Sequence, residues 1–229
     1  MNMEIGFSQL CDEISGMIRD LKRVVIAIDG MACAGKTHLA QRLAAHFPHT
    51  VVIGMDSFYL PRAQRTEERM AQPGGHMDTV RFAEQVAMPL WKADTPTYTA
   101  FDCRTQTMGQ PIACDPAAEL YIVEGTYATH PEIPDIYDLR IFVECDPAVR
   151  DERLVQREGE GAEAFARQWI VREQTYFAAY MTKELADFCF DGGRPDEGEA
   201  PADDTQADFE NLAELLPYRK GENEYDDKA

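Results

Sequence analysis

The residues most able to do chemistry lie near the start of the chain, in a glycine-containing octapeptide. Residues 30–37 match the phosphate-binding pattern G-x-x-x-x-G-K-[ST], after a predicted strand and before a predicted helix. In such a loop the backbone N–H groups surround an anion, the lysine neutralises the β- and γ-phosphates, and the hydroxyl ligates Mg²⁺. The pattern predicts a site for ATP or another nucleoside triphosphate with Mg²⁺, formed by Gly30, Met31, Ala32, Cys33, Ala34, Gly35, Lys36 and Thr37.

Two acidic residues end other predicted strands, at the edge of a parallel sheet where ligands bind. Asp56 could accept the proton of an attacking hydroxyl, and a helix cap or turn residue is the alternative interpretation. Glu124 could hold Mg²⁺ directly or through water. We therefore predict Lys36 and Asp56 as catalytic residues, with Thr37 and Glu124 as metal ligands.

Several arginines follow the last long predicted strand. Arg150, Arg153 and Arg157 share one helix face by spacing and could close over phosphates. A solvated face shared with acidic neighbours explains them equally well. Arg167 follows a glycine-containing bend and could lie on a lid.

The elements that must position these residues alternate along the chain. Short apolar runs predict strands at 23–29, 51–53, 120–123 and 139–143, with a weaker one at 187–190. Because apolar residues occupy consecutive positions, both faces of these strands should be covered. A helix is predicted before the first strand, at 7–21, and others between the strands, at 38–47, 79–91, 147–157 and 162–185. This alternation predicts an α/β fold with a five-stranded parallel sheet, helices on both faces and a small β-hairpin insertion at about 95–115.

Composition excludes several classes of protein. The chain has 41 acidic and 22 basic residues, so a nucleic-acid partner is not expected. No apolar stretch approaches the roughly 18 residues of a membrane span, and the start lacks the features of a signal peptide. Six cysteines without a Cys-x-x-Cys pair indicate free thiols, and hence a cytoplasmic protein without a membrane partner. A homo-oligomer is compatible with the sequence.

Acidic residues are concentrated at the end of the chain. Residues 191–229 contain 13 acidic and 4 basic residues, which predicts a solvated, flexible tail, or alternatively an interaction tail. The catalytic domain is therefore expected to span residues 1–190.

Three segments together resemble the uridine kinase-like P-loop kinases, a group that includes phosphoribulokinase and the bacterial pantothenate kinases. They are the P-loop, the Met-Asp-Ser-Phe-Tyr-Leu-Pro block at 55–61, and the Val-Glu-Gly of 123–125. Residues 65–78 and 101–106 resemble bacterial uridine kinase-like proteins in particular. The resemblance covers roughly residues 24–190. It implies a P-loop NTPase three-layer fold with a lid, which we place at about 157–168.

The resemblance also implies an activity and residue roles. The expected reaction is ATP- and Mg²⁺-dependent phosphorylation of a small molecule, the 5′-hydroxyl of a nucleoside, with Asp56 as the general base. Asp78 is implied to bond ribose hydroxyls, and Tyr59 and Phe101 to line the nucleoside pocket. Arg157 and Arg167 are implied as lid arginines, for the nucleotide and the acceptor respectively.

Other acceptors stay open because the sequence departs from the family pattern. Gln106 stands where uridine–cytidine kinases carry a base-reading histidine, and the lid is acidic. Pantothenate, a sugar or a sugar phosphate are alternative acceptors. A non-catalytic nucleotide-binding regulator is a further alternative, against which the intact set of Lys36, Thr37, Asp56 and Glu124 argues.

Overall fold

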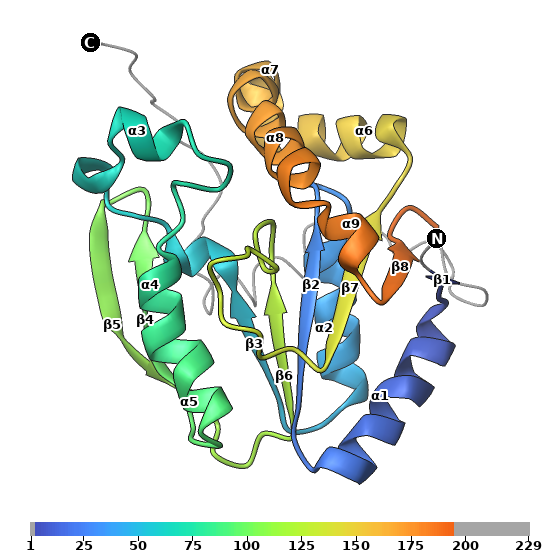
Figure 1. The fold of residues 1–229 in the computed structure, drawn as a ribbon. Helices are drawn as coiled ribbons and strands as arrows, with labels where there is room; N and C mark the ends of the chain where they lie inside the picture. Colours follow the sequence, from blue (N-terminus) through green and yellow to red (C-terminus); the bar gives the residue numbers. More distant parts are fainter. Residues whose placement is uncertain (1–2, 195–229) are drawn as a thin grey trace.

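Residues 3–194, which the computed structural model describes, are organised around a six-stranded sheet (Figure 1). The strand order is β1-β8-β7-β2-β6-β3, and every pairing is parallel. The strands are β1 (Met3–Glu4), β2 (Val24–Gly30), β3 (Thr50–Gly54), β6 (Leu120–Glu124), β7 (Leu139–Glu144) and β8 (Phe188–Asp191).

The predicted strand count was one too low. Five of the six strands are those predicted from apolar runs, and the missed one is β1, which pairs with β8. Both residues of β1 are exposed, and two residues cannot display a periodic pattern. The predicted fold class, a three-layer α/β fold with a parallel sheet, is otherwise confirmed.

Helices cover both faces of the sheet, as the consecutive apolar positions of β2 predicted. Alternate residues of β2, among them Ile26 and Ile28, pack in one core with the helices α1 (Phe7–Leu21) and α2 (Lys36–His46). The residues between them, Val25 and Ala27, belong to a second core on the other face. That face is covered by α4 (Thr79–Phe82) and α5 (Met88–Trp91), joined by a π turn at Ala83–Ala87.

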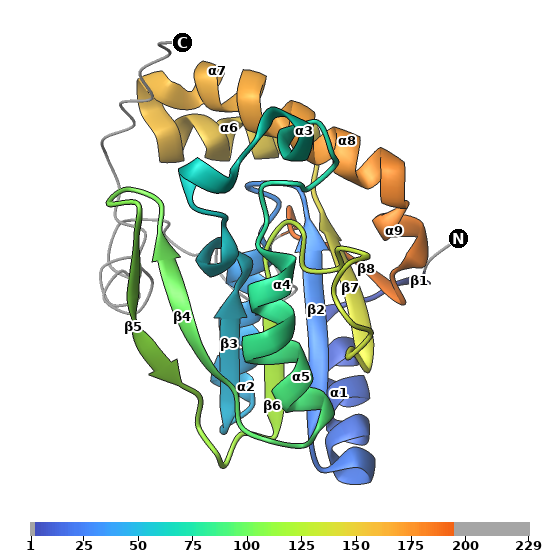
Figure 2. The same cartoon turned by 60° about the vertical axis from the view of Figure 1, so that its left-hand side comes forward.

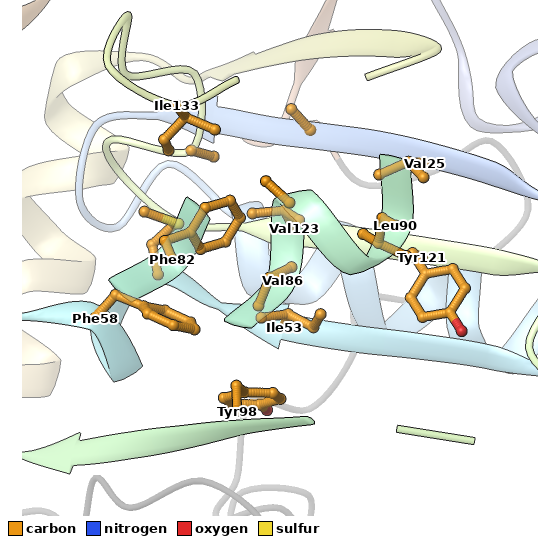
Figure 3. Packing of buried hydrophobic residues seen from close by; sticks show 14 of the residues in the cluster. Val25, Ile53, Phe58, Phe82, Val86, Leu90, Tyr98, Tyr121, Val123 and Ile133 are labelled. Carbon is orange, nitrogen blue, oxygen red and sulfur yellow. The ribbon is translucent and has the colours of Figure 1, made fainter. Parts of the chain in front are cut away.

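The second core also fixes the segment that follows β3. Figure 3 shows Phe82 beside Val123, with Phe58 close to Phe82 and Tyr98 on the far side of Phe58. The ring centroid of Phe58 lies 5.0 Å from that of Phe82 and 5.6 Å from that of Tyr98. Aromatic packing therefore joins the turn that carries Asp56 to α4 and to the next strand, β4 (Thr97–Asp102).

The predicted hairpin is present as a separate two-stranded antiparallel sheet. It consists of β4 (Thr97–Asp102) and β5 (Thr107–Ala113), with an irregularity in register between Thr99 and Phe101. In both views the hairpin lies beside β3, with β4 nearer to the main sheet than β5 (Figures 1 and 2).

A group of helices crosses the carboxyl ends of the main strands (Figures 1 and 2). It comprises α6 (Pro147–Glu158), α7 (Ala162–Phe165), α8 (Val171–Tyr180) and α9 (Thr182–Leu185), and a π turn at Ala166–Ile170 joins α7 to α8. The single helix predicted over 162–185 is interrupted at Met181, whose φ of 48° is left-handed. The lid at about 157–168 covers the end of α6, α7 and the start of this π turn, and its role stays a prediction.

Three further predictions concern the tail, membrane-spanning helices and the cysteines. The flexible tail predicted from residue 191 falls outside the described residues, apart from 191–194. Within 3–194, no helix is long and apolar enough to cross a membrane. All six cysteines lie in this part of the chain, and none of them forms a disulfide bond there.

Candidate active site

The P-loop connects β2 to α2 and depends on two glycines. Gly30 and Gly35 have φ angles of 144° and 105°, which favour glycine. A Cβ atom on Gly30 would lie 2.2 Å from the carbonyl oxygen of Val143, so a side chain cannot fit there. Helix α2 begins at Lys36, directly after the loop, so its N-terminal N–H groups face the space that the loop surrounds.

Lys36 is buried at the mouth of this loop. Its Nζ donates to the carbonyl oxygens of Gly30 and Met31, both at 2.8 Å, and to Oγ1 of Thr126 at 3.2 Å. The ammonium group is therefore held against the P-loop itself, within reach of an anion that the loop amides would bind.

The two predicted metal ligands meet at the same edge of the sheet. Oγ1 of Thr37 donates to Oε2 of Glu124 over 3.3 Å. Both groups offer oxygen ligands, which suit Mg²⁺, and such an ion keeps several waters and is bound by one or two protein groups plus phosphates. Among residues 3–194 no cluster of three or more His, Cys, Asp or Glu side chains could hold a metal. Together with phosphate oxygens, the Thr37–Glu124 pair could hold Mg²⁺.

Burial changes the acid–base behaviour of Glu124. Desolvation raises the pKa of its carboxyl group to about 7, against the opposing effects of Lys36 and of the Thr37 hydrogen bond. The charge of Asp56 contributes to this rise of the pKa, after burial.

Asp56 is exposed, in the 3-10 turn Met55–Phe58 that follows β3. Strands β3, β6 and β2 are adjacent, and the register places Gly54, Glu124 and Ile28 side by side. The turn with Asp56, the carboxylate of Glu124 and the P-loop thus lie at one edge of the sheet, as predicted from their positions after strands.

The expected acceptor residues surround the turn that carries Asp56. Asp78 caps α4 by accepting from the Arg81 backbone N–H, and it forms an ion pair with Arg81 Nε at 3.0 Å. Arg81 also donates to backbone oxygens of Ser57, Tyr59 and Thr99, and so fixes this turn against the hairpin. Arg81 is a residue that the sequence analysis missed. Tyr59 is half-buried and Phe101 is buried.

The arginines of α6 and of the π turn after α7 divide into two groups. Arg150 Nη1 lies 3.0 Å from Met31 Sδ, and Arg153 Nη1 donates to the backbone oxygens of Cys33 and Gly192 at 3.4 and 2.9 Å. Part of the predicted arginine face therefore contacts the P-loop.

The two arginines implied by the resemblance differ in position. Arg157 Nε bonds Glu158 Oε1, and its charge lowers the pKa of the Cys33 thiol, against the larger raising effect of burial. The Arg167 side chain is 69% exposed and pairs with Glu163. Arg167 thus lies on the surface, and the roles of both arginines stay predictions.

Asp29, the residue before the P-loop, was not predicted as part of the site. Its buried carboxylate accepts from the backbone N–H groups of Gly30, Tyr127 and Thr129, and from the hydroxyls of Thr129 and Tyr176. These bonds tie β2 to the segment after β6 and to α8.

Glu173 was also missed. It is a buried residue of α8, and its Oε2 accepts from the backbone N–H of Ala32 in the P-loop at 2.9 Å. A signal for it exists in the sequence, because Trp169, Glu173, Tyr176 and Tyr180 recur at helical spacing. An acid inside an aromatic stripe is the kind of buried polar residue that needs a partner.

A parallel three-layer α/β sheet with a P-loop after β2, and acids at the carboxyl ends of β6 and β3, is typical of P-loop nucleotide-binding proteins. No family model matches the chain. Uridine kinases from Streptococcus pneumoniae, among them that of the serotype 19F strain G54, are 27% identical over 185 residues, covering 74% of this chain and 86% of the relative.

Solved structures agree in fold. A possible uridine kinase from Bacillus stearothermophilus has a TM-score of 0.58 at 21% identity, covering 80% of this chain and 99% of that one. A candidate fructose transport system kinase from Silicibacter sp. TM1040 has a TM-score of 0.58 at 24% identity, covering 81% and 98%. The chain is therefore similar in sequence to uridine kinases, and it shares its fold with these solved structures.

Proposed function

We propose that the protein transfers the γ-phosphate of ATP, with Mg²⁺, to the 5′-hydroxyl of a nucleoside. The observation that carries this proposal is the convergence of Lys36, the Thr37–Glu124 pair and Asp56 at adjacent strand ends. Phosphoryl transfer needs cationic charge, a metal site and a group that orients the attacking hydroxyl.

Each residue has a physical role in this reaction. The loop amides and Lys36 bind the triphosphate and neutralise charge on its β- and γ-phosphates. Asp56 orients the acceptor hydroxyl and accepts its proton. Thr37 and Glu124 would hold Mg²⁺, which supplies further charge neutralisation when bound. Because the transition state of phosphoryl transfer is loose, positioning and charge account for most of the catalysis.

The acceptor side supports a hydroxylated substrate. Asp78 already bonds Arg81, but a carboxylate has about four lone-pair sites, so it can accept further bonds from a vicinal diol. Tyr59 and Phe101 supply aromatic surface beside the turn of Asp56, and Arg157 and Arg167 complete the proposed nucleotide and acceptor contacts.

A second candidate function is a kinase for another hydroxylated metabolite, such as pantothenate, a sugar or a sugar phosphate. It is favoured by Gln106, whose amide is engaged within the protein. Its Oε1 accepts from the Arg62 backbone N–H, and its Nε2 donates to the Cys103 carbonyl oxygen. A D-glycerate 3-kinase from Cryptococcus neoformans also shares the fold, with a TM-score of 0.52 at 12% identity, covering 83% of this chain and 90% of that one.

A screen of acceptors tests both candidates. Purified protein is given ATP and Mg²⁺ with ribonucleosides, 2′-deoxyribonucleosides, pantothenate and sugars, and ADP release is measured. We expect ribonucleosides to support turnover better than their 2′-deoxy analogues, since a site built to bond a hydroxyl discriminates against its loss. Lys36→Ala is the control, with a loss of about a hundredfold or more in kcat. Turnover of sugars or pantothenate alone would favour the second candidate, and no acceptor-dependent ADP release would favour a regulator.

A further inference from the structure

Two side chains of helix α8, Glu173 and Tyr176, lie one turn apart and contact the P-loop and the residue before it. Glu173 Oε2 accepts from the Ala32 N–H at 2.9 Å, and Tyr176 donates its hydroxyl to Asp29 Oδ2 at 2.9 Å. Glu173 is only 5% exposed. Burying a carboxylate costs free energy unless hydrogen bonds and positive charge compensate it. The fold therefore has to stabilise Glu173 at this position.

The charges around Glu173 are those proposed to bind the triphosphate. Desolvation raises the pKa of its carboxyl group, while Lys36, the Ala32 hydrogen bond and Arg157 lower it. Lys36 is the group that would neutralise the β- and γ-phosphates. Glu173 and the terminal phosphate would thus share the same loop and the same cations, and two anions there repel each other.

The same helix region contacts the acceptor side. Arg172 Nη1 donates to the carbonyl oxygen of Met70, at 3.2 Å, in the segment between Asp56 and Asp78. The ring centroid of Trp169, a residue just before α8, lies 5.3 Å from the ring centroid of His76 and 6.1 Å from that of Tyr59. A displacement of α8 at Glu173 would therefore reach Tyr59 and its neighbours.

We propose that Glu173 is a positioning residue that senses the γ-phosphate. Glu173 holds the P-loop through Ala32, and it moves away when a terminal phosphate enters the loop. Arg172 and Trp169 transmit the resulting displacement of α8 to the acceptor side, at Met70 and Tyr59. Acceptor binding is then coupled to a triphosphate rather than to a diphosphate. The inference rests on the proposed function, because it takes the P-loop to bind a nucleoside triphosphate.

The first test compares ATP and ADP binding without any acceptor. Glu173→Gln keeps the shape of the side chain and an oxygen for the Ala32 N–H, and removes the charge. We expect the ratio of ATP affinity to ADP affinity, measured by titration calorimetry, to rise about fivefold, the effect of one unit-charge repulsion at about 4 Å in water. The control Glu184→Gln removes an exposed carboxylate from α9 and should leave the ratio unchanged. An unchanged or lower ratio in folded Glu173→Gln would overturn the inference.

The second test needs no change at Glu173. The chain has two tryptophans, and Trp91 is 70% exposed on α5. In a Trp91→Phe protein, Trp169 is the remaining fluorophore. We expect ATP to change its emission more than ADP does. Equal changes with the two nucleotides, or none at saturation, would overturn the inference.

The two tests also separate this inference from the proposed function. Absence of ATP binding to the wild type would overturn both. Normal ATP binding and phosphorylation of an acceptor, with no distinction between ATP and ADP in either test, would overturn the sensing role of Glu173 alone.

Discussion

Two carboxylates at the edge of the sheet have opposite surroundings. Asp56 is exposed in the turn after β3, whereas Glu124 is buried beside Thr37 and Lys36. Solvent keeps a carboxylate charged and accessible to a mobile hydroxyl, whereas burial favours a fixed partner such as a metal ion. The difference in environment supports separate roles, with Asp56 acting on the acceptor and Glu124 on the metal.

Substitution of Asp56 tests the first of these roles. Asp56→Asn keeps the shape and removes the charge, so we expect kcat to fall by about 10² or more, a typical general-base contribution. ATP affinity should change little, because Lys36 and Thr37 are untouched. Steady-state kinetics and nucleotide titration check this, with Asp12→Asn on the exposed side of α1 as the control. Full kcat with weaker Mg²⁺ binding would instead make Asp56 a metal-shell residue.

The raised pKa of Glu124 predicts a pH effect on metal binding. Below a pKa of about 7 the carboxyl group becomes protonated, and only the carboxylate binds a metal well. We expect the Mg²⁺ affinity of the ATP complex, measured by calorimetry, to weaken as the pH falls from 8 to about 6. Glu124→Gln should bind Mg²⁺ more weakly and keep only the smaller pH dependence of the nucleotide. Identical pH profiles for the two proteins would contradict the assignment.

The sequence predicted the residues whose chemistry is encoded locally. The P-loop is a contiguous pattern, and Asp56 and Glu124 directly follow apolar strands, so their common edge follows from a parallel sheet. Asp29 and Glu173 could not be placed in this way, because their partners Tyr176 and Ala32 are more than 140 positions away. Only the fold reveals which distant donors compensate a buried acid.

At the scale of elements, Asp29 joins three parts of the fold. Its carboxylate connects β2 with the segment 125–130 after β6 and with α8. Asp29 directly precedes the P-loop in the chain, so we expect its hydrogen bonds to hold the loop in place although Asp29 itself would contact no substrate.

Asp29→Asn tests this connection. The amide presents only one acceptor oxygen, and its NH₂ group would face donors, so several bonds to a buried carboxylate are lost. We expect the free energy of unfolding to fall by about 3 kcal/mol. Denaturant unfolding measures the loss, with the exposed Asp94→Asn as the control. A loss no larger than that of Asp94→Asn would show that the bonds of Asp29 are dispensable.

Elements were predictable where periodicity was sustained. The run of consecutive apolar residues in β2 predicted a strand covered on both faces, and the two cores confirm it. The break at Met181 could not be predicted, because methionine is a good helix former and carries no signal for a left-handed residue. Strand β1 depends on pairing with β8, at the opposite end of the described chain.

At the scale of the whole molecule, charge is unevenly shared along the chain. Residues 195–229 carry 12 acidic and 3 basic residues, whereas the whole chain has a net charge of −19. The residues proposed for the site all lie before this segment.

Truncation after Arg194 tests whether the acidic segment contributes to the activity. We expect the melting temperature and kcat to stay close to those of the full chain, since the segment is acidic and poor in core-forming residues. Differential scanning calorimetry and the ADP-release assay provide the two measurements. A large fall in either quantity would show that the segment contributes to the domain.

The hairpin β4–β5 forms its own sheet and shares no strand pairing with the main one. Its register can therefore vary without disturbing the hydrogen bonds that shape the P-loop. Evolution could remodel this module for new acceptors while the ATP half stays constant, and a chimaera carrying a hairpin from a kinase of another specificity offers a direct route to redesign.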